Sequence, residues 1–137
     1  MRLFLVNNPK VSSSWKWLGE ISDVGKLYRE SDALILVSRY EGFANTVGEA
    51  MLERCFVITS KVSDMEILIG NEERGLLCEP LSPESICNAI ERLHAMSFEK
   101  KSEIVKNAKE YVELNLSLNN SIKGWDLLLT KDYNSNK

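Results

Sequence analysis

The residues best suited to chemistry lie in residues 41–51, which read EGFANTVGEAM. This segment holds two carboxylates eight positions apart, Glu41 and Glu49, with Gly-Phe after the first and small residues before the second. An ionised carboxylate only accepts hydrogen bonds, and its two oxygens can receive a pair of neighbouring hydroxyl groups. The spacing therefore suggests a ligand that presents hydroxyl groups on both sides of its centre.

A helix that opens at Asn45 or Thr46 and reaches about residue 53 would begin inside this segment. The first N–H groups of a helix, here about those of Thr46, Val47 and Gly48, have no partner within the helix. Together with the helix dipole, they favour an anion such as a phosphate. The predicted ligand is thus a diphosphate with a sugar on either side.

The two acids and Gly42 complete this hypothesis. Glu49, one turn inside the helix, would accept hydrogen bonds from a ribose, and Glu41 would do the same for a hexose. Gly42 gives the backbone freedom and lets a ligand approach the main-chain amides closely. One alternative remains open, because Thr46 and Glu49 also match a T-x-x-E capping box, in which Glu49 only bonds back to the backbone. Glu41 would then be a solvated loop residue.

The elements that must position these residues alternate along the chain. Short apolar runs predict strands at residues 2–6 (RLFLV), 14–18 (SWKWL), 33–37 (ALILV), 56–59 (FVIT) and 76–78 (LLC). Capping residues and helical periodicity predict helices over residues 23–30 after Ser22, 45–53, 64–69, 83–96 after Ser82, 97–114 with Ser97 as cap, and 118–129.

Strands that alternate with helices predict an α/β fold with a Rossmann-like, doubly wound parallel sheet. Ligands bind such sheets beyond the carboxyl ends of the strands, where loops lead into helix N-termini. Residues 41–51 follow the strand ALILV and enter a helix, so they lie at that edge. We expect one domain over residues 1–130 and a loose tail over residues 131–137.

Composition excludes several other classes. The chain has 137 residues and a net charge of −3, which gives no electrostatic footprint for nucleic acid. The run ALILV is far too short to cross a bilayer. The apolar stretch within the first ten residues is too short for a secretory signal. Three cysteines without metal-ligand spacing predict buried free thiols in a reducing compartment. We therefore expect a cytoplasmic protein, or one that faces the cytosol from the inner side of a membrane.

The whole pattern resembles a known family. The segment EGFANTVGEAM is similar to the Glu-x7-Glu signature of retaining GT-B glycosyltransferases, particularly glycosyltransferase family 4 (glycosyl transferases group 1). The flanks WLGEISDVGKLYRESDALILVSRYEGF and CFVITSKVSDMEILIGNEERGLLCEPLSPESICNAIERL resemble the same family. The form EGF-x-N is similar to members that build bacterial O-antigens, capsules and lipopolysaccharide. The resemblance covers about residues 15–129.

The resemblance implies a set of donor-binding residues. The first Glu of the signature contacts the transferred sugar and the second binds the ribose of the nucleotide, while the residues between them contact sugar hydroxyls or phosphate. The donor site then comprises Glu41, which is also the catalytic candidate, and Gly42, Phe43, Asn45, Thr46, Val47 and Glu49. The donor would be a nucleotide-sugar, by default a UDP-sugar. No Asp-x-Asp motif occurs in this sequence, so no metal and no cofactor are expected.

The same resemblance implies that part of the enzyme is missing from this chain. The chain corresponds to an N-terminally incomplete C-terminal domain, with the first GT-B domain and a glycan or lipid-linked acceptor as partners. It is expected to bind a nucleoside diphosphate but to transfer nothing alone. Members usually carry Gly where Arg54 stands and Pro where Phe56 stands, so we expect a different backbone in that turn.

Two other functions stay open at this point. The chain could be a non-catalytic, flavodoxin-like regulatory or interaction domain, in which the two acids are only structural. It could also keep the GT-B fold but belong to a sugar phosphorylase or a nucleotide-sugar epimerase.

Overall fold

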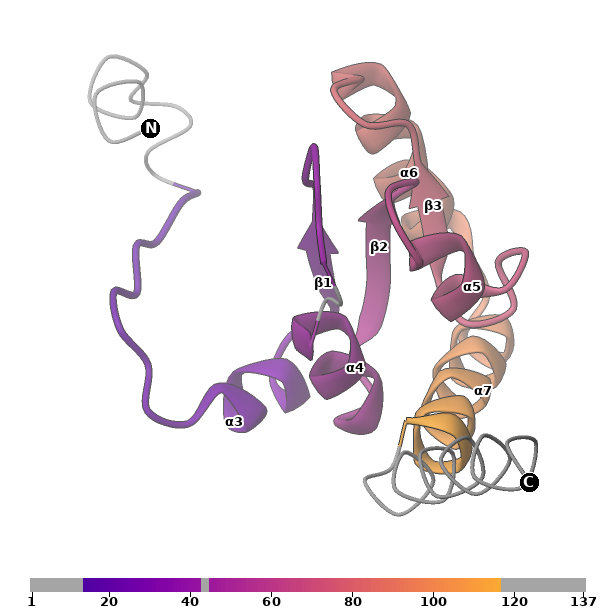
Figure 1. The fold of residues 1–137 in the computed structure, drawn as a ribbon. Helices are drawn as coiled ribbons and strands as arrows, with labels where there is room; N and C mark the ends of the chain where they lie inside the picture. Colours follow the sequence, from indigo (N-terminus) through magenta and orange to yellow (C-terminus); the bar gives the residue numbers. More distant parts are fainter. Residues whose placement is uncertain (1–13, 43–44, 117–137) are drawn as a thin grey trace, which may run out of the picture.

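The computed structural model describes residues 14–42 and 45–116, and we refer to its elements by the labels of Figure 1. They are α3 (Val24–Arg29), β1 (Ala33–Leu36), α4 (Asn45–Leu52), β2 (Phe56–Ser60), α5 (Met65–Ile69), β3 (Leu76–Cys78), α6 (Pro83–Ala95) and α7 (Phe98–Asn115). The strand predicted at residues 2–6, the helix predicted at 118–129 and the predicted tail lie outside the described residues.

The three described strands form one parallel sheet in the order β1-β2-β3 (Figure 1). Ala33 pairs with Phe56 at the start of the first ladder, and Ile58 pairs with Leu76 at the start of the second. Each neighbouring strand is therefore reached by a crossover through a helix, which is the connection that a parallel sheet requires. The predicted α/β fold with a parallel sheet is confirmed.

The central strand β2 is buried along its whole length and separates two apolar clusters. Successive side chains of a strand point to opposite faces. Val57 packs in a cluster with residues of α4, α5 and α7, whereas Phe56 and Ile58 pack in a second cluster with residues of α6. Helix α7 serves both, because Ile104 belongs to the second cluster and Ala108 to the first. Helices thus cover both faces of the sheet.

The helix starts follow side-chain capping. The hydroxyl oxygen of Ser82 accepts a hydrogen bond from the Ser85 amide at 3.2 Å, and that of Ser97 accepts one from the Lys100 amide at 3.3 Å, as predicted. At α3 the predicted cap is wrong by one residue. Asp23, rather than Ser22, caps this helix and accepts the Lys26 amide at 2.9 Å, because a charged carboxylate is the stronger acceptor at a helix N-terminus.

The turn between α4 and β2 contains Arg54 in the left-handed region, with φ of 60°. Glycine reaches this conformation without a steric penalty, whereas a side chain brings Cβ close to the following carbonyl group. Our expectation of a different backbone followed from the absence of glycine at this position. Arg54 instead adopts the left-handed conformation that glycine favours, so the backbone of this turn is strained at Arg54.

Residues 14–18 were predicted as a weak strand, and this prediction is wrong. The segment has no sheet partner among the described residues, and the Trp17 side chain is 74% exposed. A five-residue alternation of apolar and polar side chains is not enough to form a strand when no neighbouring strand supplies hydrogen bonds.

The cysteines differ from one another. Cys55 and Cys78 are buried, as predicted, and burial raises the pKa of both thiols, which keeps them protonated and unreactive. Cys87 on α6 is exposed, so the prediction of three buried thiols is wrong for this residue. The helical periodicity of α6 does not show whether a residue at the edge of its apolar face, such as Cys87, is buried or exposed.

Helix α7 is the longest of the described helices, with 18 residues, and its exposed side carries Lys-Glu pairs one turn apart. Within the described ranges, no helix is both long enough and apolar enough to pass through a lipid bilayer.

Candidate functional site

The segment that contains both acids leaves the carboxyl end of β1 and enters α4 (Figure 1). The carboxyl end of β2, at Ser60, is its neighbour in the sheet. The predicted site therefore lies at the edge where open parallel sheets bind ligands, as the sequence indicated.

The loop after β1 is tied to β2 by Ser60, whose side chain is fully buried. The Ser60 hydroxyl oxygen accepts a hydrogen bond from the Ser38 amide at 3.1 Å, and the hydroxyl group donates to the Ser38 carbonyl at 2.9 Å. One side chain thus satisfies both backbone polar groups of Ser38, two residues beyond the end of β1. The loop consequently starts from a fixed point.

Glu41 lies half-buried three residues after this point. The Ser38 hydroxyl donates to Oε1 of Glu41 at 2.5 Å, a distance typical of a hydrogen bond from a hydroxyl to an ionised carboxylate. Glu41 is thus held by the protein, in contrast to the solvated loop residue of the alternative interpretation. Its second oxygen, Oε2, has no hydrogen-bond partner among the described residues and is available as an acceptor.

Gly42 is exposed, and an added Cβ would meet nothing within 4 Å. Its φ is outside the left-handed region, so the chain does not need glycine here for backbone freedom. The space around it agrees with the other predicted role, which is to let a ligand approach the main chain. Phe43, the next residue of the predicted site, lies outside the described residues.

Helix α4 begins at Asn45 and provides the predicted anion-binding end. Asn45 and Thr46 are exposed, whereas Val47 is completely buried in the core. Val47 could therefore contact a ligand only through its backbone amide, which is the role that the sequence predicted for it. Burial of its side chain fixes the orientation of the first helical turn, and with it the direction of the free N–H groups.

Glu49 is exposed one turn inside α4, next to the hydroxyl group of Tyr28 on α3. Tyr28 is only 7% exposed and packs in the same cluster as Val47 and Met51. Burial raises the pKa of the Tyr28 hydroxyl, and the negative charge of Glu49 together with hydrogen bonding to its carboxylate raises this pKa further. Tyr28 is therefore a neutral donor that the structure brings to the second acid.

The capping-box alternative does not fit this arrangement. A capping box needs Thr46 as the residue that precedes the helix, but Thr46 lies inside α4, which begins at Asn45. The carboxylate of Glu49 interacts with Tyr28, a residue from another helix. Both acids are thus engaged by side chains that sequence reasoning did not single out. Ser38 lies only three residues before Glu41, so the bond between these two side chains is local in sequence. Ser60 and Tyr28 become neighbours only through the fold.

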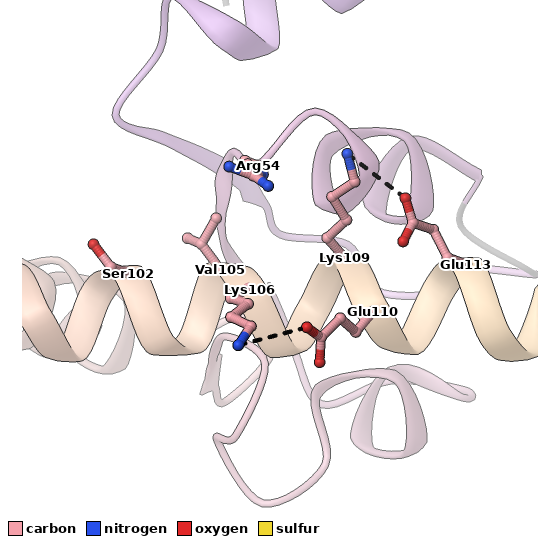
Figure 2. A pocket seen from close by; sticks show the side chains of 7 residues that line it. All are labelled: Arg54, Ser102, Val105, Lys106, Lys109, Glu110 and Glu113. Atoms are coloured by element: carbon pink, nitrogen blue, oxygen red, sulfur yellow. Dashed lines mark ion pairs between the residues drawn. The ribbon is translucent and has the colours of Figure 1, made fainter.

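Two hollows lie at the opposite edge, near the amino ends of the strands, and they were not predicted. The first has a volume of about 400 Å³ and is lined by Arg54 and the exposed side of α7 (Figure 2). The second, of about 360 Å³, shares Arg54 and Val105 with the first and reaches Asp32 and Phe56. In the first hollow, Lys106 and Lys109 face Glu110 and Glu113.

These charges neutralise each other in pairs. Lys106 lies 3.8 Å from Glu110, and Lys109 lies 3.6 Å from Glu113. Exposed pairs one helical turn apart are common on solvated helix faces. Neither hollow includes a residue of the predicted site. The part of the chain that the structure describes also contains no group of His, Cys, Asp or Glu side chains that could hold a metal ion.

Comparison with known proteins agrees with this fold. The family model of the glycosyl transferases group 1 matches residues 5–111. The chain therefore belongs to the glycosyl transferases group 1 family, and its domain is a glycosyltransferase domain.

Individual relatives extend the comparison. An uncharacterized glycosyltransferase of Methanocaldococcus jannaschii is 32% identical over 98 residues, which are 72% of this chain and 25% of that protein. The C-terminal domain of a glycosyl transferase group 1 family protein of Francisella tularensis is similar with a TM-score of 0.65 and 25% identity, over 76% of this chain and 53% of that chain.

Two solved structures of larger proteins share the fold over almost the whole chain. Sucrose-phosphate synthase from Thermosynechococcus elongatus has a TM-score of 0.82 at 24% identity, over 96% of this chain and 33% of that chain. A glycosyltransferase from Rickettsia africae has a TM-score of 0.79 at 23% identity, over 96% of this chain and 35% of that chain. The chain thus spans about a quarter of the M. jannaschii relative and about a third of these two structures.

Proposed function

We propose that this chain is the donor-binding domain of a retaining GT-B glycosyltransferase of family 4, and that it binds a nucleoside diphosphate sugar at the carboxyl ends of β1 and β2. The observation that carries the proposal is the placement of Glu41 and Glu49 on either side of the α4 N-terminus, with Ser38 donating a hydrogen bond to Glu41. Membership of the glycosyl transferases group 1 family supports it.

In this proposal each group of the ligand meets a group of suitable chemistry. The ribose hydroxyls bind Glu49, the diphosphate binds the free amides of the first turn of α4, and the hexose binds Glu41. Gly42, Phe43, Asn45, Thr46 and Val47 complete the donor site. The diphosphate binds through amides and helix dipole, so the proposal requires no metal and no cofactor. The donor is by default a UDP-sugar.

The same residues account for transfer. Negative charge develops on the departing nucleoside diphosphate, and the α4 amides stabilise it where it develops. Glu41 orients the hexose, and the acceptor hydroxyl attacks from the same face as the leaving group, so that the configuration is retained. The acceptor would be a glycan or a lipid-linked sugar, held mainly by the first GT-B domain of the complete enzyme. We place this reaction in bacterial O-antigen, capsule or lipopolysaccharide synthesis, in the cytoplasm and, for lipid-linked acceptors, at the inner face of the membrane.

Titration of the isotope-labelled chain with UDP, GDP and UDP-glucose, followed by NMR, tests the donor site. We expect shifts in the amides of Gly42 and of residues 45–49, weak affinity, and no sugar transfer by this chain alone. Shifts restricted to α7 and Arg54, or no shifts at all, would contradict the proposal. The non-catalytic alternative predicts no nucleotide-dependent shifts in the α4 amides, so the same titration distinguishes the two.

A further inference from the structure

A chain of three hydrogen bonds connects the sheet to the acid at its edge. The first ladder ends where Leu36 of β1 pairs with Thr59 of β2, so Ser38 lies beyond the last backbone pair. The Ser60 side chain nevertheless bonds both the amide and the carbonyl group of Ser38, at 3.1 and 2.9 Å. It thereby replaces the two backbone groups that a further strand residue would have offered.

Burial makes this anchor stiff. Ser60 is completely buried, and its hydroxyl group both donates and accepts, so the loss of either bond would leave a polar group of the chain without a partner. The position of Ser38 relative to β2 is therefore determined by the core. The Ser38 hydroxyl then donates to Oε1 of Glu41, which transfers this fixed position to the carboxylate.

The neighbours of Glu41 offer no substitute for this hydrogen bond. Arg39 and Tyr40, which separate it from Ser38, are both exposed, and Tyr40 is 91% exposed. Among the described residues, only Ser38 donates a hydrogen bond to the Glu41 carboxylate. Without this bond, no hydrogen bond from the described residues would restrain the half-buried side chain of Glu41.

We propose that Ser38, anchored by the buried Ser60, is a positioning residue that orients Glu41 for the sugar of the donor. It holds Oε1 and leaves Oε2 directed to a hydroxyl group of the ligand, so that this group binds an acid whose conformation is already selected. The inference rests on the proposed function only for the identity of the ligand. Its other part, that Ser38 orders the Glu41 side chain, concerns the ligand-free chain and does not depend on that function.

The conformational part is tested first, on the ligand-free chain. NMR couplings and relaxation of the Glu41 side chain are measured in the wild type, in Ser38→Ala and in Ser38→Thr. Ser31→Ala is the matched control, because the half-buried Ser31 also donates a hydrogen bond, to the Leu27 carbonyl at 2.7 Å, away from the site. We expect rotamer averaging of Glu41 in Ser38→Ala, restored order in Ser38→Thr, and wild-type behaviour in Ser31→Ala. A single Glu41 rotamer in Ser38→Ala would overturn the inference.

The functional part uses the ratio of two affinities. For each variant, the dissociation constant of UDP is divided by that of the UDP-sugar that the wild type binds most tightly among UDP-glucose, UDP-galactose and UDP-N-acetylglucosamine. Ser38→Ala is expected to lower this ratio about threefold to tenfold, the effect of weakening one hydrogen bond to a charged group, with unchanged affinity for UDP itself. Ser38→Thr should restore the ratio.

An unchanged ratio in Ser38→Ala would overturn the positioning role even if the rotamers changed. Failure of the proposed function has a different signature, because the wild type would then show no shifts with any nucleotide at Gly42 or α4. The rotamer measurement would still decide whether Ser38 orders Glu41.

Discussion

The two edges of the parallel sheet differ in how their polar groups are held. At the amino ends of β1 and β2, the surface is hollow and carries several charges, but Lys106 and Lys109 of the first hollow pair with glutamates on the same helix (Figure 2). At the carboxyl ends, the polar groups belong to different elements. Ser60 of β2 holds the loop after β1, and Ser38 of this loop donates a hydrogen bond to Glu41.

If the donor binds where we propose, the size of a hollow is a poor guide to the site in this protein. A ligand at the amino edge would have to compete with intrahelical ion pairs, and the side chains there are long and solvated. At the carboxyl edge, Ser38, which is anchored by the buried Ser60, holds Glu41, and the first α4 amides are unpaired within the helix, so less order would be lost on ligand binding. The following four experiments test this contrast.

The largest expected effect concerns Glu49. Replacement of Glu49 by Gln removes a charged acceptor of ligand hydroxyls, and we expect the affinity for UDP to fall roughly 10-fold to 100-fold, as for hydrogen bonds to charged groups. Titration by NMR or calorimetry measures this loss. Glu110→Gln, at the amino edge, is the matched control and should bind like the wild type. If Glu49→Gln and Glu110→Gln bound UDP with equal affinity, the proposed difference between the two edges of the sheet would be refuted.

The strained turn at the amino edge gives the next effect. Arg54→Gly should increase the free energy of unfolding by about 0.5–1 kcal/mol, because relief of the left-handed strain exceeds the added entropy of the unfolded chain. Arg54→Ala removes the guanidinium group but keeps the strain, and it should change stability little. Urea denaturation of the three proteins measures both effects. If the glycine variant is no more stable than the alanine variant, the turn is not strained.

A smaller effect is expected from the ion pair between Glu72 and Arg92, which joins the turn before β3 to α6. Hydrogen bonding to Arg92 lowers the pKa of Glu72, so its stabilising effect is full above the unfolded pKa and is lost as the pH falls through the folded one. Because both side chains are partly solvated, Glu72→Gln should cost less than about 1 kcal/mol at neutral pH. Urea denaturation at pH 7 and at pH 3 checks this, since the difference from the wild type should become smaller in acid. A difference of the same size at both pH values would mean that packing, not charge, accounts for it.

The smallest effect is expected from the lysines of the first hollow. Lys106→Ala and Lys109→Ala should leave the affinity for UDP unchanged, because these cations are already paired and lie at the other edge of the sheet. The titration used for Glu49→Gln provides the measurement and the positive control. A loss similar to that of Glu49→Gln would place the nucleotide at the amino edge and refute the proposed site.

Much of the fold could be predicted because local signals and burial agreed. The apolar runs at β1, β2 and β3 are strands, and Ser82 and Ser97 cap their helices as their side chains suggest. Prediction failed where local signals were weak or where a neighbour decided the outcome. Residues 14–18 alternate like a strand but have no strand beside them in the described part of the chain, and Cys87 lies on the exposed side of α6.

The sequence by itself predicted the candidate site residues and the edge of the sheet to which their segment leads. Glu41 and the start of α4 follow strand β1 in the chain, and the carboxyl ends of parallel strands meet at one edge. Only the tertiary structure decided what holds the two acids. Ser60 is 22 residues from Ser38, and Tyr28 comes from a different helix than Glu49, so neither contact has a local sequence signal. Hydrogen bonds between elements depend on the packing of the whole core, which brings distant side chains within reach of each other.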